Sequence, residues 1–250
     1  MNQLERKLIM ANWKMNKTRE EAHNFFQQFQ AKNLKQNRDV VICPPFTSLA
    51  IAREYADEGG FTVGAQNFHP EPNGAFTGEI SAAMLNEIGV RVVLAGHSER
   101  RTIFNETDTM VNKKVLTALK NDLYVCLCIG ETLTERESNK TNSILSKQLE
   151  IGLGGVELPI QDTYLLSVAY EPVWAIGTGK VATLDQIKET HKFIKSELEK
   201  MYPGVLVPVL YGGSVNEKNA SEILAIHGVD GVLVGGASLD PDKFAAIINA

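Results

Sequence analysis

The amino-acid sequence predicts an α/β fold, a (β/α)₈ barrel that occupies residues 1–250 as a single domain. The chain has 250 residues, which is the usual size of such a barrel, and about 75% of the unfolded surface can be buried at this length. Short apolar runs alternate with longer segments of helical periodicity. No Pro/Ser-rich or low-complexity segment separates the two halves, so we expect one continuous domain.

Eight short apolar runs are the expected strands of the barrel. They consist almost entirely of Val, Ile, Leu and Ala, which is typical of parallel strands covered on both faces. The runs are Leu8–Trp13, Val40–Cys43, Phe61–Ala65, Val92–Ala95, Tyr124–Ile129, Leu165–Ala169, Val207–Tyr211 and Val232–Val234.

An open, doubly wound sheet is the alternative fold. It would normally carry a glycine-rich dinucleotide-binding turn after an early strand. The first run instead ends in residues 11–14, Ala-Asn-Trp-Lys, which contain no glycine. The barrel is therefore the favoured fold.

Capping signals mark helix starts between the runs. A capping box pairs a Ser or Thr N-cap with Glu or Gln three residues later, and the pairs here are Thr18 with Glu21, Thr132 with Glu135 and Thr183 with Gln186. Asp240-Pro241 opens the last helix in the same way, with a cap followed by proline. The helix after Thr183 carries an apolar stripe that includes His191, so we expect this histidine to be packed rather than catalytic.

Composition and charge exclude several classes of function. The apolar fraction of 44% and the charged fraction of 22% are typical of a soluble globular protein, and no apolar run approaches the roughly 18 residues of a membrane span. The net charge of −5 argues against a nucleic-acid partner. The first residues lack the apolar core of a secretory signal, so we expect a cytoplasmic protein without membrane contact.

The three cysteines indicate reduced, buried thiols rather than a disulfide or metal site. Cys43, Cys126 and Cys128 are an odd set, and all lie in apolar runs. Cys126 and Cys128 lack the two-residue gap of a zinc or redox pair, and the period of a strand directs both to one side. We expect no metal and no cofactor.

Polar residues and glycines follow the expected strands at their carboxyl ends, where (β/α)₈ barrels carry their chemistry. Each could be structural: a solvated lysine, a turn histidine, or a glycine that turns the chain. Because all lie at the same end of their strands, together they favour a functional site. They are Asn12 and Lys14 after the first strand, residues 96–99 after the fourth, Glu171 after the sixth, residues 212–214 after the seventh, and Gly235 and Gly236 after the eighth.

Glu171 is the strongest single candidate. It ends an apolar run and precedes Pro172, which restricts it to an extended conformation at the strand tip. Gly177 and Gly179 follow, and their backbone freedom suits a segment that swings or brings N–H groups to an anion. The alternative is a strand-end glutamate beside an ordinary glycine turn.

Together these residues suggest proton transfer next to a carbonyl in a phosphorylated substrate. Glycine pairs after the seventh and eighth strands, with the Ser214 hydroxyl, are typical of a barrel phosphate site. A carboxylate, a histidine and a lysine accompany them, without metal ligands, a nucleophile triad or a cofactor fingerprint. Glu171 would take the proton and His97 would serve the oxygen.

Several segments closely resemble the triosephosphate isomerase family, and the resemblance runs from end to end of the chain. They are residues 11–16 (AlaAsnTrpLysMetAsn), 73–81, 96–101 (GlyHisSerGluArgArg), 128–132, 169–180 and 211–215. The resemblance implies a cofactor-independent isomerase that interconverts dihydroxyacetone phosphate and D-glyceraldehyde 3-phosphate through an enediolate, a reaction of glycolysis and gluconeogenesis.

The resemblance also implies a role for each matched catalytic residue. Glu171 would be the general base, and loss of water should raise its pKa. His97 would be a neutral imidazole acting on the oxygen, with Ser98 capping the short helix behind it. Lys14 would offset the charge of the phosphate and the enediolate, and Asn12 would donate a hydrogen bond to the substrate oxygen. Glu99 would pair with Lys14.

A lid and a homodimer are further implications of the resemblance. Residues 172–180 would close over the phosphate, whose ligands would be Gly177, Ser214, Gly235 and Gly236. The loop at residues 66–81 would dock into a second subunit, where Thr77 would support that subunit's Asn12 and His97.

Two other functions stay open. A different phosphate-binding barrel enzyme, such as a sugar-phosphate epimerase, would need a metal site or a second acid beside Glu171, and the sequence offers neither. A catalytically silent barrel that serves as a scaffold is the other, and Glu171, His97 and Lys14 all count against it.

Overall fold

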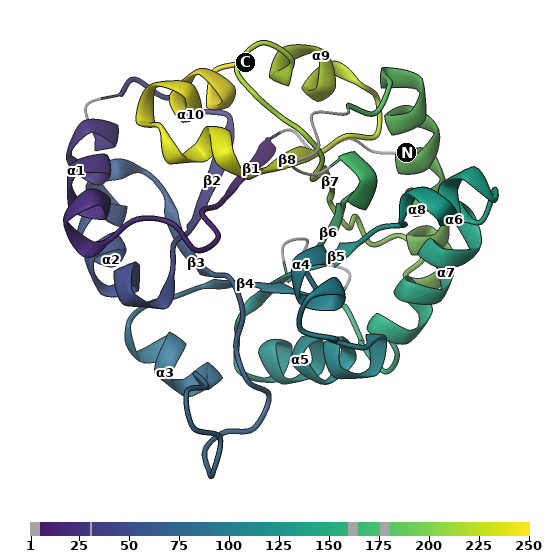
Figure 1. Ribbon diagram of the computed structural model, residues 1–250, viewed down its shortest axis with the longest axis horizontal. Coiled ribbons are helices and arrows are strands. Elements are labelled where there is room, and N and C mark those ends of the chain that lie inside the picture. The colour runs from purple at the N-terminus through teal and green to yellow at the C-terminus, as the bar shows by residue number, and fades with distance from the viewer. Residues whose placement is uncertain (1–5, 31, 160–164, 176–180) are drawn as a thin grey trace.

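Eight parallel strands close into a barrel in the order of the sequence, and β8 pairs with β1 (Figure 1). The computed structural model describes residues 6–30, 32–159, 165–175 and 181–250. The strands are β1 Lys7–Asn12, β2 Arg38–Cys43, β3 Thr62–Ala65, β4 Val92–Ala95, β5 Tyr124–Ile129, β6 Leu166–Tyr170, β7 Val209–Tyr211 and β8 Gly231–Val234. The predicted (β/α)₈ barrel is confirmed.

Helices surround the strands on the outside of the ring (Figure 1). The α-helices are α1 Arg19–Gln30, α2 Leu49–Gly59, α3 Ala82–Glu87, α4 Ser98–Thr102, α5 Asp108–Lys120, α6 Leu133–Glu137, α7 Thr141–Gly152, α8 Leu184–Met201, α9 Ala220–Ala225 and α10 Pro241–Ile248. Three short 3₁₀ helices are η1 Phe46–Ser48, η2 Val173–Ala175 and η3 Gly236–Leu239.

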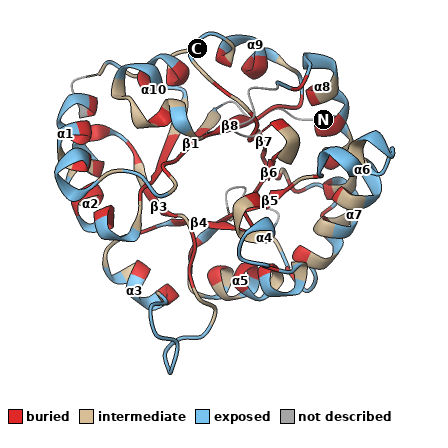
Figure 2. Cartoon of the chain, viewed as in Figure 1, coloured by how far each residue is buried: buried red, intermediate tan, exposed pale blue. Residues whose placement is uncertain are grey.

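Side chains that alternate along the strands divide between two apolar cores. In β1, Met10 points into the barrel, whereas Ile9 and Ala11 face the surrounding helices. Figure 2 shows the strands and the inward faces of the helices as buried. Cys126 and Cys128 lie together in the inner core as free thiols, so the prediction that they share one side of a strand is confirmed.

The predicted capping devices are confirmed. Thr132 and Thr183 each accept a hydrogen bond from the N–H of the third residue of the helix and receive the reciprocal side-chain bond. Glu21 N–H donates to the Thr18 hydroxyl, and the Glu21 carboxylate accepts from Thr18 N–H. Asp240 caps α10 and is followed by proline. These contacts satisfy N–H groups that the first helical turn leaves unpaired.

His191 is packed inside the protein, as expected from its place on the apolar stripe of α8. Its side chain is fully buried, and Nδ1 lies 3.2 Å from the carbonyl oxygen of Gly228. Burial lowers the pKa of His191 to about 3. The imidazole is therefore neutral at ordinary pH.

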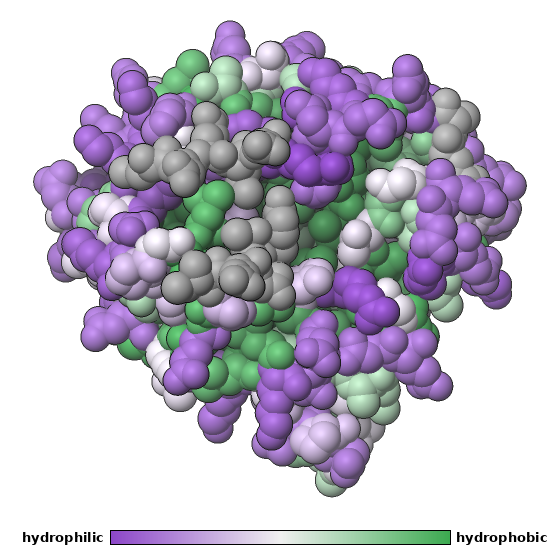
Figure 3. Space-filling model, turned by 180° about the vertical axis from the view of Figure 1, so that it is seen from behind, coloured by the Kyte–Doolittle hydropathy of each residue, from purple (hydrophilic) through white to green (hydrophobic). Residues whose placement is uncertain are grey.

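The segment between β3 and α3 projects away from the body of the barrel (Figure 1). Residues 71–79 of this loop are exposed. Polar side chains dominate the outline of the face seen in Figure 3, with apolar residues showing between them. Across the described residues, no helix combines the length and the apolar character needed to span a bilayer.

Candidate active site

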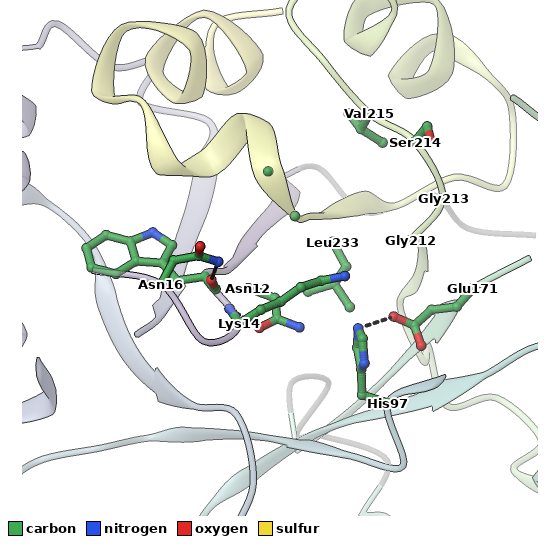
Figure 4. A pocket seen from close by; sticks show the side chains of 13 residues that line it. Asn12, Lys14, Asn16, His97, Glu171, Gly212, Gly213, Ser214, Val215 and Leu233 are labelled. Carbon is green, nitrogen blue, oxygen red and sulfur yellow. Dashed lines mark hydrogen bonds and ion pairs between the residues drawn. The ribbon is translucent and has the colours of Figure 1, made fainter. Parts of the chain in front are cut away.

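A cavity of about 260 Å³ lies at the carboxyl ends of the strands (Figure 4). The structure brings seven of the predicted site residues to its wall, from β1 and from the segments after β4, β6, β7 and β8. They are Asn12, Lys14, His97, Glu171, Ser214, Gly235 and Gly236. The remaining predicted substrate ligand, Gly177, lies outside the described residues.

His97 and Glu171 form a buried pair at the wall of this cavity. The His97 Nε2 atom lies 2.9 Å from Oε1 of Glu171, and the Ser98 N–H donates to Oε2 at 2.9 Å. Figure 4 marks the contact between His97 and Glu171 with a dashed line. His97 is 5% exposed and Glu171 2%. The Glu171 N–H is held by the carbonyl of Ile129 at 2.7 Å, so the chain and the side chain are both anchored.

The other nitrogen of the His97 ring fixes its tautomer. The Glu99 N–H donates to Nδ1 at 3.2 Å, which requires a lone pair on Nδ1 and leaves the proton on Nε2. His97 is consequently the N-cap residue of α4. The prediction that Ser98 caps this helix is wrong, because Ser98 is the first helical residue and its N–H is already bonded to Glu171.

Each member of the pair shifts the pKa of the other. Burial raises the pKa of Glu171. The interactions with His97, the Ser98 N–H and Lys14 lower the pKa by more than burial raises it, so the net shift is downward. Burial lowers the pKa of His97, but the Glu171 carboxylate outweighs it, so the net shift is upward. The cavity therefore holds an ionised carboxylate that accepts a hydrogen bond from the imidazole.

Lys14 and Asn12 approach this pair from β1. Figure 4 shows Lys14 reaching across the cavity toward His97. Its Nζ lies 2.7 Å from Oε1 of Glu99, which confirms the predicted Lys14–Glu99 pair. Lys14 has a φ of 54°, and its N–H donates to the Asn12 carboxamide at 3.0 Å. The Gln66 amide holds the Lys14 carbonyl at 2.9 Å. This turn orients both side chains.

Backbone from the ends of β7 and β8 forms the opposite wall. Gly235 is the N-cap of η3, Gly236 begins it, and both line the cavity. The first N–H groups of a helical turn have no partner within the turn. Ser214 donates its hydroxyl to the carbonyl of Ala175 at 2.7 Å. The wall can therefore bind a phosphate through backbone N–H groups, with a hydroxyl close by.

Glu131 is a residue that sequence reasoning missed. It is completely buried, and its Oε1 accepts hydrogen bonds from Arg136 at 2.9 Å, Tyr170 at 3.1 Å and Trp174 at 3.0 Å. Trp174 belongs to η2, directly after Glu171, so Glu131 anchors the start of the predicted lid. Its position after the fifth strand was the available signal.

Two further predictions concern Thr77 and metal binding. Thr77 is exposed on the projecting loop, between β3 and α3. Over the described ranges, no three His, Cys, Asp or Glu side chains gather closely enough to hold a metal ion.

Comparison with known proteins gives a consistent family assignment. The family model described as triosephosphate isomerase matches residues 7–250. The triosephosphate isomerase of Aquifex aeolicus is 45% identical over 246 residues, which cover 97% of this chain and 98% of that protein. The protein of the same name from Nitratidesulfovibrio vulgaris is 47% identical over 254 residues, covering 98% and 100%. The chain therefore belongs to the triosephosphate isomerase family.

Proposed function

We propose that this enzyme interconverts dihydroxyacetone phosphate and D-glyceraldehyde 3-phosphate, with Glu171 as the base. The observation that carries the proposal is the buried His97–Glu171 pair at the end of a cavity whose opposite wall offers N–H groups. A small phosphorylated triose would place its phosphate at Gly235 and Gly236 and its carbonyl beside His97. No cofactor takes part in this chemistry.

The reaction transfers one proton between adjacent carbons. The Glu171 carboxylate removes a proton from the carbon that bears the hydroxyl group, and the electron pair forms the carbon–carbon double bond of an enediolate. The Nε2–H of His97 donates to the oxygen that gains charge, and the proton of the substrate hydroxyl passes by way of Nε2 to that oxygen, so the former hydroxyl oxygen becomes the new carbonyl. Glu171 then returns the proton to the neighbouring carbon. Substrate has to separate the two side chains, because each uses the other as its present hydrogen-bond partner.

The negative charge of the substrate has to be offset by groups inside the cavity. The whole chain carries a net charge of −5, so attraction of an anion depends on groups inside the cavity. Lys14 supplies the positive charge, and Asn12 supplies an amide donor. As the closing lid removes water, the loss of solvation favours the protonated form of Glu171 and raises its pKa toward that of a base near neutral pH.

An isotope experiment tests the reaction directly. Purified protein is incubated with dihydroxyacetone phosphate in D₂O and the products are followed by NMR. We expect D-glyceraldehyde 3-phosphate with deuterium on carbon, since a proton held by Glu171 exchanges with solvent. Absence of any turnover supports the catalytically silent scaffold. Turnover of a pentose phosphate without turnover of the triose supports the epimerase.

We also propose that the enzyme is a cytoplasmic homodimer formed through the loop at residues 66–81. Beside the active site lies a second cavity of about 390 Å³, lined in part by Met15, Phe46 and Phe104. Met15 is 96% exposed and Phe104 60%. Such exposed apolar side chains around a hollow are typical of an interface, and Thr77 on the projecting loop would enter the partner subunit there. Three free, buried cysteines favour a reducing compartment.

Light scattering coupled to size exclusion tests the dimer. We expect a mass of twice 27.5 kDa for the parent protein. Phe104→Glu should yield a monomer with much reduced activity, because charge is buried at the interface. Leu116→Glu, at another exposed apolar position on α5, is the control and should stay dimeric. A fully active parent protein with the mass of one chain contradicts the proposal.

A further inference from the structure

We propose that Arg101 is a positioning residue that sets the separation of His97 and Glu171 by tying the end of β4 to the end of β5. This inference rests on the catalytic roles proposed above for His97 and Glu171. Arg101 does not line the active-site cavity, so it acts through its neighbours and not on the substrate.

The guanidinium group of Arg101 makes three contacts in different directions. Its Nε donates to the carbonyl of Gly96 at 2.6 Å, its Nη2 donates to the carbonyl of Cys128 at 3.1 Å, and its Nη1 pairs with Asp108 at 2.5 Å. The side chains of Arg101 and Asp108 are 15% and 19% exposed. A planar group with several fixed donors holds these three acceptors in one defined arrangement.

The first contact holds Gly96, the residue between the end of β4 and His97. Gly96 has a φ of 72°, a conformation that favours glycine. A Cβ at this position would lie 2.8 Å from Nη2 of Arg101 and 2.9 Å from a methyl group of Val111. The guanidinium therefore packs directly against the Gly96 backbone, and its bond to the Gly96 carbonyl defines the plane of the peptide that enters His97.

The second contact binds the carbonyl of Cys128, which lies beyond the pairing of β4 with β5. The pairing of β4 with β5 ends at Ala95 opposite Leu127, so Cys128 lies beyond the last paired residue. Arg101 supplies the donor for its carbonyl. A buried carbonyl without such a donor would be destabilising. Arg101 thus extends the connection between the two strands past the point where their backbones separate.

The next carbonyl along β5 binds the backbone N–H of Glu171. Ile129, the residue after Cys128, accepts the hydrogen bond from the Glu171 N–H at 2.7 Å. The backbone of His97 is therefore connected to that of Glu171 through Gly96, Arg101 and two consecutive residues of β5. Removing Arg101 breaks this connection at one point and leaves the ring of His97 held by its bonds to Glu171 and to the Glu99 N–H.

Kinetics of Arg101 variants test the inference. A displacement of about 1 Å can reduce turnover on the order of 100-fold, so we expect Arg101→Met to lower kcat by that order while KM for the triose phosphate changes little. Arg101→Lys, which keeps the charge but lacks the planar fork of donors that reaches separate acceptors, should fall in between. Guanidinium chloride below denaturing concentration should restore part of the kcat of Arg101→Ala, and sodium chloride at equal ionic strength should not.

The pH profile gives a readout that lost stability alone would not change. His97 helps to lower the pKa of Glu171 in the substrate-free protein. A loosened pair weakens this effect, so the acid limb of kcat/KM should move to higher pH in Arg101→Met. Asp108→Asn removes only the ion pair that anchors the guanidinium. It should shift kcat and the acid limb in the same direction as Arg101→Met but by a smaller amount. This variant tests the inference if the Arg101 variants fail to fold.

A second buried ion pair provides the matched control. Lys195 and Asp230 lie 2.6 Å apart, with side chains 9% and 0% exposed, and Asp230 precedes β8, at the end of the barrel away from the cavity. Lys195→Gln should lower stability and leave kcat unchanged. The inference is overturned if Arg101 variants fold and keep the parent kcat and acid limb although His97→Gln is inactive. If His97→Gln is also fully active, the proposed function itself fails.

Discussion

Glu171 has a hydrogen-bond partner for each carboxylate oxygen in the substrate-free protein, His97 for one and the Ser98 N–H for the other. This resting position depends on the absence of a side chain at Gly212. A Cβ there would lie 2.9 Å from Cγ of Glu171, well inside ordinary van der Waals contact. The end of β7 therefore leaves the space that the Glu171 carboxylate occupies.

Gly212→Ala should displace the Glu171 side chain and lower kcat. The backbone of Gly212 has no positive φ, so alanine is acceptable there except for the contact with Glu171. We expect a decrease on the order of tenfold to 100-fold, measured under substrate saturation. Gly152→Ala on α7, whose Cβ would meet Leu127 at an unstrained 3.4 Å, is the control. Equal kcat values for the two variants would contradict the steric explanation.

Position at a strand end made several site residues predictable, whereas side-chain partners were less so. Glu171, His97 and Lys14 come within two residues of the ends of their strands, and barrel closure brings them together whatever their rotamers. The prediction of Ser98 as the N-cap of α4 is wrong because the residue that starts a five-residue helix depends on local backbone angles. Glu131 was missed because two of its three donors, Tyr170 and Trp174, come from a segment distant in sequence.

At the scale of elements, residues 176–180 of the predicted lid lie outside the described ranges, but the chain on either side of them is anchored. At its start, Trp174 of η2 donates to Glu131. At its end, the capping box of Thr183 and Gln186 begins α8, an amphipathic helix of 18 residues. The capping box was readable from sequence because it depends on residues three apart, while the Glu131 anchor depends on the tertiary fold.

Thr183→Ala should destabilise the protein by about 1 kcal/mol, because the first turn of α8 loses its side-chain acceptor. The free energy of unfolding is measured by urea titration at one fixed protein concentration. Thr183→Ser keeps the hydroxyl and should retain most of the stability. If the alanine and serine variants unfold at the same urea concentration, the hydroxyl of Thr183 does not stabilise α8.

At the scale of the molecule, alternation of apolar runs and helical segments determined the barrel. Each predicted run became a strand, with small shifts of its ends. β7 begins at Val209 and not at Val207, because Pro208 has no N–H to continue the ladder. The exposed loop at residues 71–79 has no explanation within one chain, which is why its proposed role involves a second subunit.

The buried neutral His191 predicts a loss of stability in acid. Its pKa of about 3 in the folded protein lies below the usual value near 6.5, so the unfolded chain binds a proton first as pH falls. This contribution is complete above pH of about 6.5 and decreases by up to roughly 1.4 kcal/mol per pH unit below it. His191→Gln should flatten the dependence of the unfolding free energy on pH between 6 and 4 by one proton per chain. An unchanged slope would show that His191 is already protonated when folded.

The proposed role of Glu171 is to move a proton between the carbons of the triose through its carboxylate. Its most direct test is the rate at which Glu171→Gln incorporates deuterium from D₂O into the product of dihydroxyacetone phosphate. The carboxamide keeps the size and burial of the side chain but cannot accept the proton, so we predict a rate about 10²-fold to 10⁴-fold below that of the parent. Isomerisation and deuterium incorporation at the parent rate by the folded variant would contradict the account.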